Sequence, residues 1–231
     1  MGIRHKPEQE QWLSKDLQQT FAQHADPTKA IGMEKYMKNH FVFFGIAAPE
    51  RRQLQQTFFG RYKALDRQEK DQVLEDLWQT PQRECQYAAC DWLRSEAKTL
   101  PQGYADNVEA LVCRKSWWDT VDGLAGHVLG TYLLLYPKER DSRLERWMAS
   151  GNLWLQRCAV LHQLTYRSKT DADLLYGLVL SLADSKAFFL QKAMGWALRE
   201  YAKTDPNGVR TWLQGKKLPA LTLREATKHL R

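Results

Sequence analysis

Apolar residues recur at helical spacing along almost the whole chain, and this periodicity limits the fold more than any other feature of the sequence. No segment shows the alternation of apolar and polar residues that is typical of a half-buried strand. Gly and Pro are sparse, with 13 and 8 among 231 residues, which argues against a disordered, collagen-like or turn-rich all-β chain. The sequence therefore predicts an all-α protein.

Residues typical of helix starts separate these periodic segments. Three prolines stand where a first-turn proline opens a helix: Pro27, Pro49 and Pro81. Two pairs have the spacing of a capping box: Ser116 with Asp119, and Thr222 with Glu225. These signals predict helices of about 12 to 16 residues that are joined by short polar turns.

Many helices without one long heptad run favour stacked helix pairs over a coiled coil. One antiparallel pair with its turns takes about 35 to 45 residues, which is the period of HEAT-like units. We therefore expect a curved α-α superhelix, or solenoid, whose concave face is lined by one helix of each pair. A single domain is expected to run from Lys6 to Arg231.

The charge balance favours a polyanionic partner. The chain has 34 Lys and Arg against 27 Asp and Glu, which gives a net charge of +7. The segment 199–231 alone carries eight basic and three acidic residues. An excess of this kind is suited to a nucleic acid or to an anionic membrane surface.

Several other classes of protein are disfavoured. The longest uncharged stretch, 124–137, has 14 residues, whereas a helix needs about 20 to cross a bilayer, so no membrane partner is expected. The cysteines form no C-x-x-C pair and lie in helical contexts: Cys85, Cys90, Cys113 and Cys158. We expect reduced core thiols, no zinc or other metal site, and a cytoplasmic location.

The segment KSWWDTVD (115–122) carries the most informative polar residues. Trp118 and Asp122 are four residues apart and share one helix face, next to the face that Trp117 and Val121 would bury in the core. An indole and a carboxylate on such a face fit an active site. They fit equally well a boundary tryptophan beside a solvated aspartate, and the spacing leaves both interpretations open.

Two later residues extend this pair. Arg157 follows Asp122 by 35 residues, and Trp196 follows Arg157 by 39, so each step is about one helix pair. Equivalent places in successive units of a curved array share one face. The spacing thus predicts that a carboxylate, two indoles and a guanidinium converge, although Arg157 can instead form an ion pair with a nearby Asp or Glu.

These segments resemble the AlkD-type DNA alkylation repair glycosylases, whose fold is built from HEAT-like repeats. The likeness runs in order along nearly the whole chain, through YMKNHFVFFGIAAPERR (36–52), KSWWDTVDGLAGHVLG (115–130), NLWLQRCAVLHQLTYR (152–167), FFLQKAMGWALREYAK (188–203) and LTLREATKHL (221–230). The resemblance implies catalytic residues Asp122, Trp118 and Trp196, and DNA-binding residues Arg157, Tyr36 and Arg199.

The resemblance also implies an activity, the hydrolysis of the N-glycosidic bond of N3- or N7-alkylated purines in double-stranded DNA. Such a purine is already cationic and leaves as a neutral base, so a lone carboxylate is chemically adequate and no cofactor is expected. A monomer in the bacterial cytosol, associated with the nucleoid through DNA, is expected. Two alternatives remain: a HEAT-like module that binds damaged or branched DNA without catalysis, and a protein-binding scaffold.

Overall fold

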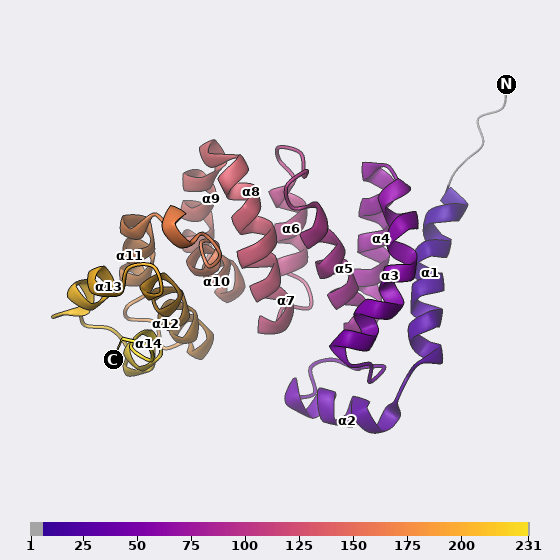
Figure 1. The fold of residues 1–231 in the computed structure, drawn as a ribbon, viewed down its shortest axis with the longest axis horizontal. Helices are drawn as coiled ribbons and strands as arrows, with labels where there is room; N and C mark the ends of the chain where they lie inside the picture. The colour runs from indigo at the N-terminus through magenta and orange to yellow at the C-terminus, as the bar shows by residue number, and fades with distance from the viewer. Residues whose placement is uncertain (1–6, 231) are drawn as a thin grey trace. The chain divides into compact units, whose positions relative to one another are not determined.

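The protein is described by a computed structural model of residues 7–230, with side chains from Leu13 onward. Helices account for the regular structure of these residues, apart from one isolated bridge between Val42 and Gln82. The prediction of an all-α chain is confirmed (Figure 1). Lys6, the predicted start of the domain, lies outside the described residues.

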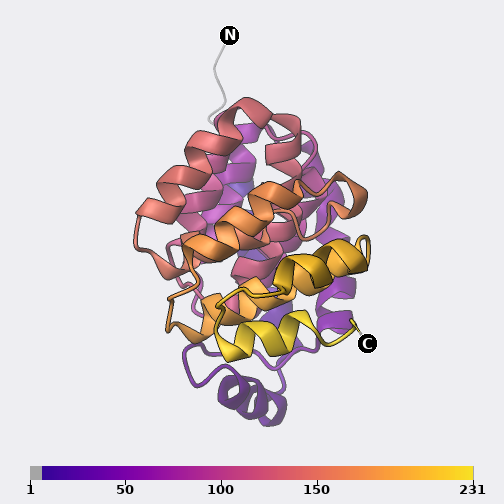
Figure 2. The same cartoon turned by 90° about the vertical axis from the view of Figure 1, so that its left-hand side faces the viewer.

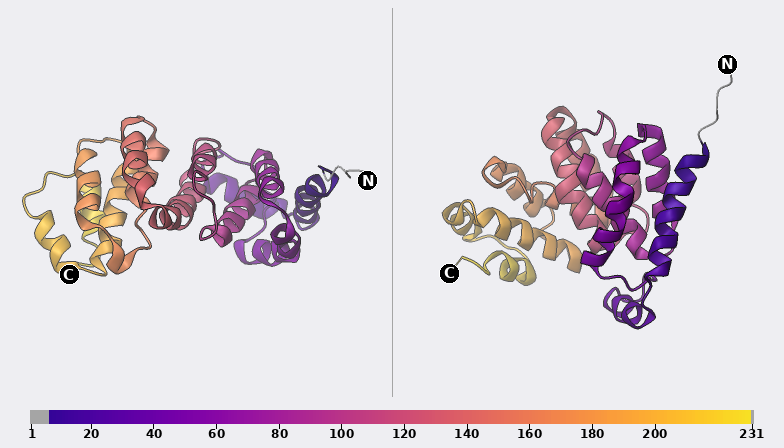
Figure 3. Two further views of the ribbon diagram at one scale, coloured as in Figure 1. Left: turned by 90° about the horizontal axis from the view of Figure 1, so that it is seen from above. Right: turned by 45° about the vertical axis from the view of Figure 1, so that its right-hand side comes forward.

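The chain divides into two compact units, with the boundary between Leu93 and Arg94. The helices of the first unit are α1 (Pro7–Gln23), α2 (Pro27–Tyr36), α3 (Ala48–Ala64), α4 (Arg67–Gln79) and most of α5 (Arg83–Glu96). In this unit α1 packs against both α3 and α4 (Figure 3). That the chain forms one domain stays a prediction.

A buried carboxylate in the first unit holds the loop between α2 and α3. Glu84, which is 1% exposed, accepts hydrogen bonds from the backbone N–H groups of Phe44, Gly45 and Ile46 at 2.9 to 3.1 Å. Gly45 has φ +90°, and a Cβ at this position would lie 2.1 Å from the carbonyl oxygen of Asp26. Glycine is therefore required where this loop passes the start of α2.

The second unit begins at Arg94 and contains the segment in which the sequence places the functional residues. Its helices are α6 (Ala105–Val112), α7 (Trp118–Gly123), the π-helix η1 (Leu124–Leu129), α8 (Gly130–Leu135), α9 (Pro137–Ala149), α10 (Leu153–Leu161), the 3-10 helix η2 (Arg167–Lys169), α11 (Ala172–Ser181), α12 (Phe188–Ala202), α13 (Pro206–Leu213) and α14 (Ala220–Ala226). Helix α10 is central in this unit, because it packs against α7, α9, α11, α12 and η1.

A π-helix joins α7 and α8 into one continuous rod (Figure 1). It starts two residues after Asp122, so Trp118 and Asp122 keep ordinary α-helical phase within α7. At its end, a Cβ on Gly130 would lie 2.2 Å from the carbonyl oxygen of His162. Because Gly130 has no side chain, the rod can approach His162, the residue that follows α10. Single π-helical turns within α-helices are frequent at functional sites.

Helices α12 and α14 also pack at close range (Figure 2). A Cβ on Gly195 would lie 2.4 Å from the Cβ of Glu225 and 2.7 Å from the carbonyl oxygen of Thr222. The hydroxyl of Thr222 donates to the carbonyl oxygen of Gln191 at 3.1 Å. Thr222 is the third residue of α14, so the predicted capping box with Glu225 is wrong, and both side chains serve the contact with α12 instead.

The proline-based helix starts are reproduced in part. Asp26 caps α2 and Pro27 opens it, which confirms that start, and α3 begins one residue before Pro49. Pro81 does not open α5. Because Gln82 pairs with Val42 in the isolated bridge, the helix starts only at the next residue.

The second predicted capping box is wrong as well. The hydroxyl of Ser116 donates to the carbonyl oxygen of Val112 at 2.6 Å, so it closes the end of α6. Helix α7 then begins at Trp118 without a side-chain cap. The Ser-x-x-Asp spacing is present, but the serine is used by the preceding helix.

Three further findings concern the membrane spans, metal sites and disulfides that the sequence disfavours. Among residues 7–230, no helix has both the length and the apolar character that crossing a bilayer requires. In the same part of the chain, no cluster of three or more His, Cys, Asp or Glu side chains is arranged to hold a metal ion. None of the four cysteines forms a disulfide bond. Cys85 and Cys158 are buried and Cys90 is half-buried, whereas Cys113 is exposed, so the expectation of a core position is wrong for Cys113.

Candidate active site

A cavity of about 380 Å³ lies in the second unit, where α7, α10, α12 and α14 meet. Its lining residues are Trp118, Asp122, Arg157, Phe188, Phe189, Lys192, Trp196, Arg199 and Glu225. The structure thus brings together five of the six residues that the sequence singles out. Their roles in catalysis or DNA binding stay predictions.

The carboxylate of Asp122 is held by the guanidinium of Arg157. Nε of Arg157 donates to Oδ1 at 2.6 Å, and Nη2 donates to Oδ2 at 2.8 Å. Nη1 donates to the backbone carbonyl of Phe189 at the start of α12. Arg157 therefore forms an ion pair, as the alternative interpretation of the sequence proposed, and its partner is the predicted catalytic residue itself. A two-point contact of this kind fixes the orientation of the carboxylate.

Both members of this pair are largely removed from water. The side chain of Asp122 is 15% exposed and that of Arg157 is 5% exposed. Burial raises the pKa of Asp122 above its usual value, and the hydrogen bonds and positive charge of Arg157 oppose this rise. Asp122 is thus a positioned carboxylate that is harder to ionise than a solvated one.

Aromatic rings support the pair from one side. The ring of Phe189 lies 4.9 Å from that of Trp117 in an edge-to-face arrangement, and 5.1 Å from that of Trp154. These three rings form a packed cluster at the starts of α7, α10 and α12. Contacts of this kind restrict the backbone of Phe189, whose carbonyl holds Arg157.

Two indoles and a row of cations complete the lining. Trp118 lies one helical turn before Asp122, and both Trp118 and Trp196 are half-buried. On α12, Lys192 and Arg199 lie one turn before and one turn after Trp196. This face of α12 therefore presents an aromatic ring between two positive charges.

The carboxylate of Glu225 binds these cations from α14. It accepts from Nζ of Lys192 at 2.7 Å and from Nη1 of Arg199 at 2.7 Å. Nζ of Lys228 contacts both of its oxygens, at 2.7 and 2.9 Å. The side-chain hydrogen bonds from Lys192 and Lys228 lower the pKa of Glu225 to about 2.

Tyr36, the sixth predicted residue, belongs to the first unit. It is the last residue of α2, it is 66% exposed, and it lines a separate cavity with Lys29, Arg51 and Tyr87. The structure therefore describes its surroundings within that unit only, and its role at a lesion stays a prediction.

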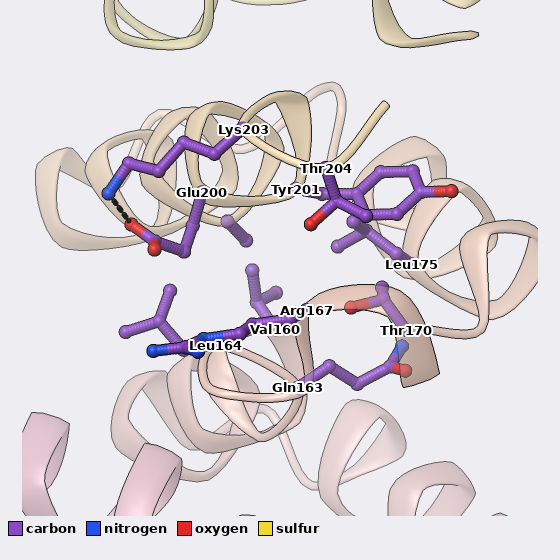
Figure 4. Close-up of a pocket in the computed structure, with 11 residues that line it drawn as sticks. Val160, Gln163, Leu164, Arg167, Thr170, Leu175, Glu200, Tyr201, Lys203 and Thr204 are labelled. Atoms are coloured by element: carbon purple, nitrogen blue, oxygen red, sulfur yellow. Dashed lines mark hydrogen bonds and ion pairs between the residues drawn. The ribbon is translucent and has the colours of Figure 1, made fainter. Parts of the chain in front are cut away.

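The second unit contains another cavity, which is also lined by residues of α10 and α12 (Figure 4). Its lining residues are Val160, Gln163, Leu164, Arg167, Thr170, Leu175, Ala197, Glu200, Tyr201, Lys203 and Thr204. Its only carboxylate, Glu200, pairs with Lys203 at 2.6 Å, and Figure 4 marks this contact with a dashed line. No residue that the sequence singles out as catalytic lines it.

Sequence reasoning did not assign four of the nine lining residues of the first cavity to the site: Phe188, Phe189, Lys192 and Glu225. Glu225 enters the prediction only as part of a capping box, although it binds residues 26 and 33 positions earlier in the chain. Phe189 contributes through its backbone carbonyl, which no side-chain pattern reveals. One feature of the sequence could have indicated an acidic partner: on α12, two cations, Lys192 and Arg199, flank Trp196 on one helix face.

Comparison with known proteins identifies the family to which the chain belongs. Residues 17–230 match the family model described as DNA alkylation repair enzyme. The chain belongs to the DNA alkylation repair enzyme family. A solved structure described as a predicted DNA alkylation repair enzyme from Enterococcus faecalis is similar to the chain, with 32% sequence identity and a TM-score of 0.84. The similarity covers 89% of this chain and 96% of that one. None of the curated proteins matches the chain.

Membership of the DNA alkylation repair enzyme family supports a role in DNA repair, with DNA as the substrate.

Proposed function

We propose that this member of the family is a monofunctional DNA glycosylase that hydrolyses the N-glycosidic bond of N3- or N7-alkylated purines in duplex DNA. The observation that carries the proposal is the cavity in which the desolvated carboxylate of Asp122 lies with the indoles of Trp118 and Trp196. The reaction needs neither metal nor cofactor, because the leaving group is activated by its own alkylation. As part of the same proposal, the protein acts as a monomer.

The chemistry asks for little more than charge stabilisation. As the bond from C1′ to the purine nitrogen breaks, its electron pair neutralises the cationic base, and positive charge develops on the deoxyribose. A water molecule then forms the new bond to C1′, and the proton that it loses passes to the solvent. A carboxylate about 4 Å from the sugar cation contributes at most about 4 kcal/mol at an effective dielectric constant near 20, which is roughly a thousandfold in rate. The positive charge of Arg157 opposes this attraction and makes the value an upper limit.

Arg157 has a double task in this proposal. It orients Asp122 through two hydrogen bonds, so the carboxylate does not need to reorganise when charge develops. A guanidinium carries five N–H donors, and three of them are used on Asp122 and on Phe189. The others remain for a DNA phosphate, which is the role that the resemblance implies.

The two indoles select for charge. The face of a tryptophan attracts a nearby cation by about 0.5 to 2 kcal/mol, depending on how far the pair is desolvated. Trp118 and Trp196 can act in this way on an alkylated purine or on the sugar cation. We therefore expect a preference for cationic over neutral lesions.

The direct test incubates the protein with duplex DNA treated with a methylating agent and identifies the released bases by chromatography. We expect 7-methylguanine and 3-methyladenine to appear, and their release to persist in the presence of a chelator. Undamaged duplex is the control substrate. Salt-dependent DNA binding without any base release would favour the non-catalytic DNA-binding module instead.

A further inference from the structure

The arrangement of charges around Glu225 distinguishes it from the other carboxylates of the second unit. Its side chain is 5% exposed, yet it contacts three cations, Lys192, Arg199 and Lys228, all at 2.7 Å. Those cations are 37%, 20% and 45% exposed. An anionic ligand that approaches this surface therefore meets the cations, and the carboxylate lies beneath them.

The depth of Glu225 is built into the packing of α14 on α12. The Cβ of Glu225 occupies the space that a side chain at residue 195 would need, which is why Gly195 is required there. The bond from Thr222 to the carbonyl of Gln191 fixes the preceding turn of α14 on the same helix. The carboxylate thus has a defined position relative to Lys192 and Arg199 on α12.

The cations keep hydrogen-bonding capacity. A lysine ammonium has three donors and an arginine guanidinium has five. Lys192 and Arg199 each spend one donor on Glu225. Without the carboxylate, three positive charges within a few ångströms would repel one another and spread apart. With it, they stay grouped beside Trp196 and still carry a net positive charge.

We propose that Glu225 is a positioning residue for phosphate binding: it holds Lys192 and Arg199 in place beside the cavity, so that the DNA backbone is seated with the lesion near Trp196 and Asp122. The inference rests on the proposed function, since it takes damaged duplex DNA as the ligand. The inference gives α14 a part in recognising damaged DNA, in addition to its packing on α12.

The test substitutes Glu225→Gln, which keeps a hydrogen-bond acceptor and removes the charge. The readout is the affinity for a duplex with a tetrahydrofuran abasic-site analogue relative to the same duplex undamaged, at several salt concentrations. We expect this preference to fall about tenfold, within the range of coupled neighbours. Affinity for the undamaged duplex should stay equal or rise, because the variant is more positive by one charge.

Glu109→Gln is a matched control. Glu109 also collects several donors, from Arg146 at 2.6 Å, from Nε1 of Trp147 at 2.8 Å and from Arg143 at 3.3 Å, and it does not line the cavity. This control should lower the melting temperature and leave the preference for damaged duplex unchanged.

Two results would overturn the inference. One is a Glu225→Gln variant with unchanged preference. The other is a variant that loses affinity for both duplexes in parallel with its melting temperature, which indicates a purely structural role. If Glu225→Gln does not fold, Glu225→Asp keeps the charge but shortens its reach, and it should lose part of the preference. Base release by the unsubstituted protein is measured separately. If that protein releases no base, but Glu225→Gln still loses the preference for damaged duplex, the result contradicts the glycosylase proposal and leaves the role of Glu225 in binding intact.

Discussion

Two cavities of equal volume, about 380 Å³ each, lie in the second unit and share α10 and α12 in their walls. Each contains a carboxylate that is paired with a cation. In the candidate active site, Asp122 at 15% exposure is bound at two points by Arg157 at 5% exposure. In the other cavity, Glu200 at 31% exposure meets Lys203 at 57% exposure through one contact.

The two cavities therefore differ in the desolvation and fixation of a charge and not in volume, and under the proposed function this difference is what suits the first cavity to catalysis. Removing a carboxylate from water costs free energy, and a buried pair persists only where its geometry is well satisfied. Asp122 meets that condition, and burial raises its pKa. An exposed pair such as Glu200 with Lys203 contributes at most about 1 kcal/mol and costs little to form.

The largest expected effect comes from Asp122→Asn. The amide has nearly the same shape but no charge, so it cannot stabilise the sugar cation. We expect the turnover of methylated duplex to fall at least tenfold, towards the roughly thousandfold that the Coulomb argument allows. DNA affinity should stay nearly intact. Single-turnover base release and a binding titration on the same protein measure the two quantities.

An Asp122→Asn variant with full activity would show that the roles assigned to the first cavity are wrong. Its melting temperature is a useful companion measurement, because the substitution leaves the buried charge of Arg157 without its partner, and such a change is strongly destabilising. Comparing rates at a temperature where both proteins are folded separates the two effects.

The second effect is a pH dependence, because the pKa values of two carboxylates that line the same cavity are shifted in opposite directions. Burial raises the pKa of Asp122, so base release should fall as the pH drops through that raised value, by about tenfold per unit once below it. The same shift means that the folded state takes up this proton more readily than the unfolded state, so protonating Asp122 does not destabilise the fold.

Glu225 behaves in the opposite way. Its pKa is lowered from 4.5 to about 2, so its ion pairs stabilise the fold fully above the unfolded value, and this stability is lost as the pH falls from about 4.5 to about 2. As the pH is lowered, folded protein should therefore take up a proton at Asp122 before it does so at Glu225, and base release should fall while the ion pairs of Glu225 persist. Melting temperatures measured along the pH–rate profile check this, and coincidence of the fall in rate with the loss of stability would contradict the assignment of that fall to Asp122.

A smaller effect is expected from Trp196→Ala. Loss of the indole face should reduce the release of 7-methylguanine by about 2- to 30-fold, the range that corresponds to a cation–π contact of about 0.5 to 2 kcal/mol. Trp196→Phe keeps a weaker aromatic face and should lose less. Equal losses for a cationic and a neutral lesion would show that the ring acts through shape and not through its attraction for charge.

Part of this site could be predicted from the sequence, because it depends on residue spacing within one helix and on an approximate repeat of one helix pair. Trp118 and Asp122 share a face because both precede the π-helix that begins at Leu124. The steps of 35 and 39 residues that lead to Arg157 and Trp196 bring them to the same cavity. The all-α fold follows from the periodicity for the same reason, since each helix carries its own apolar stripe.

The rest depends on which of several available partners a polar group takes. Ser116 has the spacing of a helix cap, but a carbonyl of the preceding helix takes its hydroxyl. Arg157 can bind a phosphate or a carboxylate, and only the fold shows that Asp122 is within reach. Glu225 meets Lys192 and Arg199 because Gly195 lets two helices approach closely, and sequence spacing does not reveal that distance.

The smallest effect is expected from Glu200→Gln, the counterpart of Asp122→Asn in the second cavity (Figure 4). The substitution breaks an exposed contact three residues apart on one helix, with Nζ of Lys203 at 2.6 Å from the carboxylate. Such pairs stabilise a helix by about 0.3 to 0.5 kcal/mol, so the melting temperature should change by no more than a few degrees. Base release should stay within twofold of the unsubstituted protein, because a solvated carboxylate at this place stabilises no charge that develops in the reaction. A loss comparable to that of Asp122→Asn, measured in the same single-turnover assay, would mean that both cavities take part in catalysis and that desolvation is not what separates them.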